Sequence, residues 1–163
     1  SSRQLLRQDL VSVVRSAISK TLIKPSNLKL ELTESLVMEN PEQSAHVLSR
    51  LKDMGVGLSL DDFGTGYSSL SYLTRFPFDT IKIDRTFLTG DLPQKKKLLR
   101  AIVAMAHDLG LAVVTEGVET DKDARQLRQI QCEFAQGFMF GQPVSADQAL
   151  GMMKLQFPLA ETA

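Results

Sequence analysis

Two hydrophobic periodicities alternate along the chain. Apolar residues recur at the three- and four-residue spacing of amphipathic helices in one set of segments, residues 3–20, 41–54, 98–109 and 120–129. Shorter apolar or alternating segments between them predict strands at residues 28–33, 56–61, 81–84 and 112–117, with a weaker strand at 132–135. Short helices are expected at 68–73 and after Pro143. The chain therefore predicts a helix followed by five strand–helix units.

Local signals mark several helix ends. Asn40 and Pro41 are favoured as the N-cap and first residue of a helix, and Gly55 is expected to end that helix. Thr120 with Asp123 three residues later predicts a capping box. These signals support the helices that the periodicity predicts.

Regular alternation of strands and helices predicts an α/β fold with a parallel sheet, either a (βα)8 TIM-like barrel or an open doubly wound sheet. A closed barrel typically needs about 250 residues. The chain has 163 residues. We therefore expect a single domain over residues 1–163 that forms an incomplete barrel.

Composition restricts the partners. Nineteen basic residues balance nineteen acidic residues, so no general basic surface favours a DNA or RNA polymer. Cys132 is the only cysteine, which excludes an internal disulfide and indicates a reducing, cytoplasmic location. The sequence begins without Met and enters helical periodicity at once, as a segment of a longer protein would. A membrane tether elsewhere in such a protein is compatible with these observations.

Polar residues interrupt one face of the predicted strands, mostly near their carboxyl ends. They are Glu31, Asp61, Asp62, Lys82 and Glu116. Parallel strands are normally apolar on both faces, and uncompensated buried carboxylates are costly. Oxygen ligands without a histidine or cysteine set favour Mg²⁺ or Mn²⁺. An Asp-Asp pair alone is more often a helix N-cap, but four acidic positions at strand ends favour a metal site.

Five motifs together resemble the EAL family of cyclic di-GMP phosphodiesterases. They are LELTES at 30–35, DDFGTGYSSL at 61–70, IKID at 81–84, EGVE at 116–119 and QGFMFGQP at 136–143. The resemblance implies the last five βα units of a (βα)8 barrel. It also implies hydrolysis of cyclic di-GMP to linear pGpG with two Mg²⁺ or Mn²⁺ ions.

The resemblance assigns roles to individual residues. It implies metal ligands at Glu31, Asp61, Asp62 and Glu116, with catalytic roles for Lys82, Asp61 and Glu116. It implies supporting or loop positions at Glu34, Phe63, Gly64, Thr65, Gly66, Glu119 and Gln136, and a substrate surface at Phe138 and Pro143. Alternatives are a salt bridge for Lys82, a helix-dipole interaction for Glu119, and ordinary core and turn roles for Phe138 and Pro143. His107 is expected to be an exposed or capping residue.

The chain departs from the family pattern at its start. The signature Glu-Ala-Leu strand and an Asn metal ligand do not occur in it, and the resemblance implies that they would precede Ser1 with about three strands. Alternatives to an enzyme are therefore a non-catalytic cyclic di-GMP receptor or a scaffolding fragment. A sugar-phosphate barrel enzyme is disfavoured because residues 136–143 do not resemble a phosphate cradle. The resemblance also allows a homodimer and an upstream sensor or GGDEF-type domain.

Overall fold

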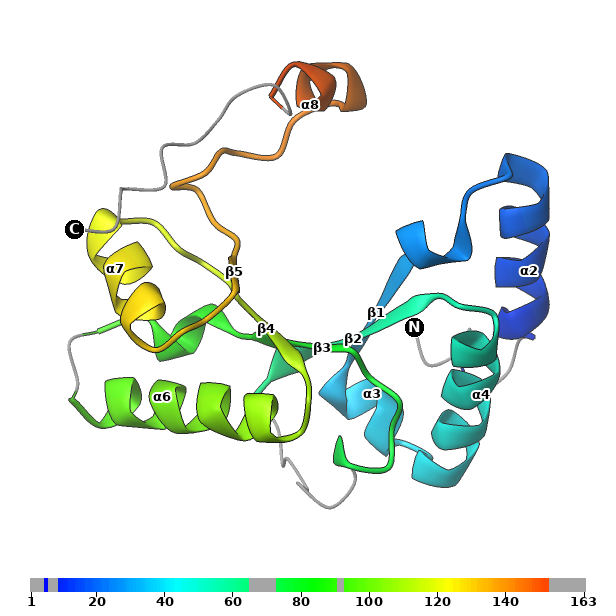
Figure 1. Ribbon diagram of the computed structural model, residues 1–163, viewed down its shortest axis with the longest axis horizontal. Coiled ribbons are helices and arrows are strands. Elements are labelled where there is room, and N and C mark those ends of the chain that lie inside the picture. Colours follow the sequence, from blue (N-terminus) through cyan, green and yellow to red (C-terminus); the bar gives the residue numbers. More distant parts are fainter. Residues whose placement is uncertain (1–4, 6–8, 65–72, 91–92, 153–163) are drawn as a thin grey trace.

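A computed structural model describes residues 5, 9–64, 73–90 and 93–152 of the chain. Its centre is a sheet of five parallel strands whose spatial order equals their order in the sequence (Figure 1). The strands are β1 (Lys29–Thr33), β2 (Gly57–Phe63), β3 (Thr80–Ile83), β4 (Ala112–Thr115) and β5 (Phe134–Ala135). The architecture is that of a partial TIM-like barrel, which confirms the predicted fold class.

Helices connect the strands. They are α2 (Leu10–Thr21), α3 (Glu34–Met38), α4 (Pro41–Asp53), α6 (Pro93–Asp108), α7 (Asp121–Gln129) and α8 (Ala146–Met152), with 3-10 turns at Pro25–Asn27 and Arg85–Phe87. The sequence prediction missed α3 and began α6 five residues late, at Leu98. Most of the helix predicted at 68–73 lies outside the described residues, as does the start of the helix predicted at 3–20.

The predicted helix caps are confirmed. The Asn40 side chain accepts a hydrogen bond from the Gln43 amide at 3.3 Å, and Pro41 occupies the first turn of α4. Thr120 and Asp123 form a reciprocal capping box at the start of α7. Both caps satisfy amide groups that have no partner within the helix, which explains why each helix begins at these residues.

The hydrophobic core lies between the strands and the helices α4 and α6, which contact β2 and β4 respectively. Its fully buried members include Leu48 and Leu51 of α4, Leu58 of β2, Ile81 of β3 and Leu99 of α6. Each such side chain contributes about 1.5–3 kcal/mol on transfer from water. This packing fixes the strands on which the polar residues of the predicted site stand.

Strand β2 is longer and less regular than predicted. It continues past Asp61 to Phe63, and its register against β3 shifts between Leu60 and Phe63. Asp62, inside this shift, has a φ of 56°, in the left-handed region that non-glycine residues seldom adopt. A β-bulge of this kind redirects side chains locally and is common beside functional sites.

The segment after β5 forms an arm that carries α8 away from the sheet (Figure 1). Residues 141–148 of this arm are exposed. None of the helices in the described residues has the length and hydrophobicity needed to span a membrane.

Candidate metal and phosphodiester site

Lys82 is the centre of the polar cluster on the sheet. Its Nζ lies 2.9 Å from Glu31 Oε2, 3.0 Å from Asp61 Oδ1 and 2.7 Å from Glu116 Oε1. These carboxylates come from β1, from β2 and from the residue that follows β4. The parallel register aligns the carboxyl ends of the strands, so residues distant in sequence meet at one edge of the sheet.

Lys82 is almost enclosed, since its side chain is 8% exposed. Burial alone disfavours the ammonium, but hydrogen bonds to Glu116, Glu31 and Asp61 outweigh it and raise the pKa of Lys82 above its ordinary value. The side chain therefore remains a fixed positive charge among the carboxylates.

A second grouping overlaps the first. Asp61, Asp62 and Glu116 each place a carboxylate oxygen within 4.8 Å of the others. The bulge in β2 explains how two adjacent residues contribute together, because successive side chains of a regular strand point to opposite faces. Glu31, Asp61 and Glu116 contact the Lys82 ammonium, and Asp62 adds a fourth carboxylate to the group, so formal negative charge exceeds positive charge here. Hard oxygen donors with this excess charge fit a divalent cation such as Mg²⁺ or Mn²⁺.

Glu34 connects the start of α3 to the end of β2. Its side chain is 7% exposed, and its Oε2 accepts a hydrogen bond from the Gly64 amide at 3.4 Å. Gly64 has a φ of 92°, and a Cβ at this position would lie 2.5 Å from Phe87 Cζ. Glycine is therefore required by both backbone angle and space. Phe63 is buried beside it, whereas Thr65 and Gly66 lie outside the described residues.

Three other predicted residues gather in a hollow beside β4. Gln136, Phe138 and Pro143 line it together with Val114 and Phe140, and its volume is about 620 Å³. Phe138 is 61% exposed, which disfavours the core role considered from the sequence. Val114 pairs with Lys82 across β3 and β4, so one wall of the hollow borders the polar cluster.

Glu119 stands apart from the other acidic positions. It is exposed, two residues before α7 begins. Within the described part of the chain it is not a member of the three-carboxylate group formed by Asp61, Asp62 and Glu116. This position leaves the helix-dipole interpretation open.

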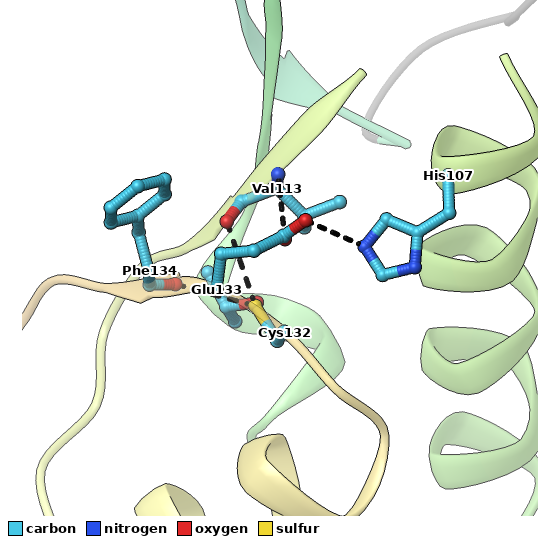
Figure 2. A network of polar contacts seen from close by, with 6 residues as sticks. His107, Val113, Cys132, Glu133 and Phe134 are labelled. Carbon is cyan, nitrogen blue, oxygen red and sulfur yellow. Dashed lines mark hydrogen bonds and ion pairs between the residues drawn. The ribbon is translucent and has the colours of Figure 1, made fainter. Parts of the chain in front are cut away.

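Sequence reasoning missed one polar network. The Glu133 carboxylate lies between His107 of α6 and the backbone of β4 (Figure 2). His107 is therefore a paired, partly buried residue and not the exposed or capping residue that was expected. No local spacing could have indicated this contact, because its members come from three separate elements.

Comparison with known proteins shows which family the chain matches. Residues 1–143 match the family model described as "EAL domain". The cyclic di-GMP phosphodiesterase NbdA of Pseudomonas aeruginosa is 45% identical over 141 residues, covering 85% of this chain and 18% of the relative. The chain spans about a fifth of the length of most of the curated relatives it matches.

Solved structures agree with the sequence relatives. The structure titled "PaMucR Phosphodiesterase, c-di-GMP complex" matches with a TM-score of 0.88 and 42% identity, over 91% of this chain and 61% of that chain. The EAL domain of Mycobacterium smegmatis DcpA matches with a TM-score of 0.86 and 37% identity, over 93% of this chain and 69% of that chain.

Proposed function

This chain belongs to the EAL-domain family, and on that premise we propose that it hydrolyses one phosphodiester bond of cyclic di-GMP to give linear pGpG. The observation that best supports the proposal is the cluster around Lys82, where carboxylates from separate strands converge at one edge of the sheet. The names of NbdA and of the MucR complex support the choice of substrate.

The chain's carboxylates suit a two-metal site. Asp61, Asp62 and Glu116 would hold Mg²⁺ or Mn²⁺, with Glu31 as a further oxygen ligand. Two such ions, when bound, would lower the pKa of water and stabilise the charge of the phosphate oxygens. The fit rests on the excess negative charge and on the close approach of the three carboxylates.

The protein groups have complementary tasks in the proposed reaction. A water oxygen attacks phosphorus, the bond from phosphorus to one ribose 3′ oxygen breaks, and a proton passes to that leaving oxygen. Lys82 would place its positive charge beside the phosphate, and one of its three N–H donors, which now point at Glu31, Asp61 and Glu116, would turn to the attacking water. Asp61 and Glu116 would keep Lys82 charged while they also serve as ligands.

Substrate would enter from the hollow beside β4. A guanine base can stack on Phe138, whose ring is exposed, while Gln136 offers amide hydrogen bonds near the reaction centre. Glu34 would hold Phe63 and Gly64 in place through its contact with the Gly64 amide. The loop roles of Thr65 and Gly66 stay predictions from the resemblance. Glu119, a homodimer and an upstream sensor or GGDEF-type domain remain predictions from the resemblance.

Hydrolysis of cyclic di-GMP by this chain with Mn²⁺ or Mg²⁺ tests the proposal, with pGpG measured by chromatography. Asp61→Asn should abolish turnover, whereas Asp53→Asn, an exposed control in α4, should not change it. Binding of cyclic di-GMP without hydrolysis would replace the proposal with the receptor alternative. Failure to bind any divalent cation would favour the scaffolding alternative.

A further inference from the structure

The Glu133 carboxylate bridges a helix and a strand of the sheet (Figure 2). Its Oε1 lies 2.9 Å from His107 Nε2, and its Oε2 accepts a hydrogen bond from the Val113 amide at 3.1 Å. Partial burial opposes the charged form, but the hydrogen bond from its own backbone amide, the contact with His107 and the hydrogen bond from Val113 hold the pKa of Glu133 below its ordinary value. The carboxylate is thus fixed in position by two elements.

The neighbouring Cys132 holds the same strand. Its Sγ lies 3.3 Å from Thr115 Oγ1, 3.7 Å from the Val113 carbonyl oxygen and 3.3 Å from the Phe134 carbonyl oxygen. Burial raises the pKa of the Cys132 thiol, so the group acts as a neutral hydrogen-bonding partner. Glu133 therefore binds the amide of Val113, and Cys132 contacts its carbonyl oxygen.

Backbone hydrogen bonds also join the segment after Glu133 to the end of β4, close to Glu116. The Gln136 amide donates to the Thr115 carbonyl at 2.9 Å, and the Val118 amide donates to the Gln136 carbonyl at 3.0 Å. Glu116 lies between these two bonds. A Cβ at Gly137 would lie 2.2 Å from the Val118 carbonyl oxygen, so only glycine allows the two backbone segments to approach this closely.

From these contacts we propose that His107 and Glu133 are positioning residues for Glu116 and Gln136. The pair orders residues 132–136 against β4, and this register sets where the Glu116 carboxylate and the Gln136 amide stand. The inference rests on the proposed function for the roles of Glu116 and Gln136. His107 and Glu133 touch neither the substrate nor the carboxylate group, and they act only through the backbone of β4.

His107→Ala and Glu133→Ala test the inference, with Glu133→Gln as the conservative variant. Changes in groups that orient metal ligands typically cost about 10- to 100-fold in affinity or activity. We expect Mn²⁺ affinity and kcat to fall about tenfold in both alanine variants while KM changes less than about twofold. Glu133→Gln keeps an oxygen for the Val113 amide and a polar amide group facing His107 Nε2, so it should restore most of both quantities.

His46→Ala and Glu39→Ala are matched controls, since both residues are exposed on or beside α4. All variants are compared well below their unfolding temperatures, where a merely stabilising contact would not change kcat. Backbone amide chemical shifts of Glu116 and Gln136, measured without ligand, provide a readout that does not need activity. These shifts should change in both alanine variants and not in the controls.

Unchanged Glu116 and Gln136 shifts in the alanine variants would overturn the positioning role, whatever the activity. If kcat and Mn²⁺ affinity per folded molecule were unchanged in the alanine variants, the positioning role would also be overturned. A wild-type chain that neither binds Mn²⁺ nor hydrolyses cyclic di-GMP would contradict the proposed function instead. The amide shifts would then still decide whether the pair orders this part of β4.

Discussion

Asp61 and Asp62 are adjacent in β2, yet each places a carboxylate oxygen within 4.8 Å of the other. The positive φ of Asp62, 56°, and the register shift that surrounds it make this possible. Backbone strain at this point therefore brings like charges together, an arrangement that is unfavourable without a cation.

Replacing Asp62 should raise the stability of the metal-free protein and weaken metal binding. Asp62→Gly relieves both the left-handed strain and the charge repulsion, so the metal-free free energy of unfolding should rise by roughly 0.5–1 kcal/mol. In wild type, Mn²⁺ at 100 times its Kd should add about 2.7 kcal/mol, and the variant should lose most of this gain. Urea unfolding with and without Mn²⁺ measures both effects.

Asp62→Asn is the matched control for backbone conformation, because Asn tolerates the left-handed region better than most residues. It should lose the Mn²⁺ effect while keeping at least the wild-type stability without metal. A destabilised Asp62→Gly beside a normal Asp62→Asn would contradict the role assigned to strain.

Lys82→Met should lower stability and abolish hydrolysis, whereas it should strengthen metal binding. Removing the ammonium leaves three carboxylates facing one another, and we expect a loss of about 2 kcal/mol, less than the 3–5 kcal/mol typical of fully buried pairs. Glu31 in particular is 49% exposed, so water screens part of the effect. Hydrolysis should disappear.

Mn²⁺ should stabilise Lys82→Met more than wild type, because the cation no longer competes with an ammonium for the same carboxylates. Thermal unfolding over a Mn²⁺ titration measures this difference. Lys97→Met, at an exposed position of α6, controls for loss of a charge. Equal Mn²⁺ effects in all three proteins would argue against a metal site at Lys82.

Gly64→Ala should be costly for two separable reasons. The left-handed φ disfavours a side chain by about 1–2 kcal/mol, and the added Cβ meets the Phe87 ring. Phe87→Ala introduced into the same chain should remove the steric part and leave the backbone part. A double-mutant cycle of unfolding free energies measures the coupling, and simple additivity would show that the two residues do not interact.

Asp79 should make stability fall in acid. Burial opposes its charge, but hydrogen bonds from Lys52 and the Leu58 amide hold the pKa of Asp79 below its ordinary value. A depressed folded-state pKa means that this stabilisation is full above the unfolded pKa, about 3.9, and is lost as the pH falls through the folded value. Asp79→Asn should therefore cost about 1 kcal/mol at pH 7, with exposure limiting the effect.

Urea unfolding at pH 7, 5 and 3 checks this dependence. The difference between wild type and Asp79→Asn should be the same at pH 7 and 5 and should shrink at pH 3. Asp108→Asn, at an exposed position near the end of α6, should show no such difference. A gap between wild type and Asp79→Asn that persists unchanged at pH 3 would rule out a charge-dependent contribution.

Local chemistry made much of the fold predictable. Asn40 and Thr120 are caps whose partners lie within one helical turn, so the sequence alone contains the whole interaction. Period-two alternation likewise placed Glu31, Asp61 and Lys82 on one face, because the pleat depends only on neighbouring residues. Their contacts follow once the strands are parallel and in register.

Other features depend on partners distant in the sequence. The extension of β2 through Asp62 requires a register shift against β3, and α3 is only five residues long, too short for a periodic signal. Glu133 gave no signal at all, since its partners His107 and Val113 come from different elements. Tertiary context decided each of these cases.

The identical order of strands in space and in sequence has a consequence for how the chain folds. Each strand pairs with the strand that precedes it, so no pairing must wait for a distant segment to arrive. Each pairing then closes only a short loop and loses little chain entropy, and neighbouring units can join the sheet one after another. The carboxylates of the site, divided among these units, would come together only as the last of them docks.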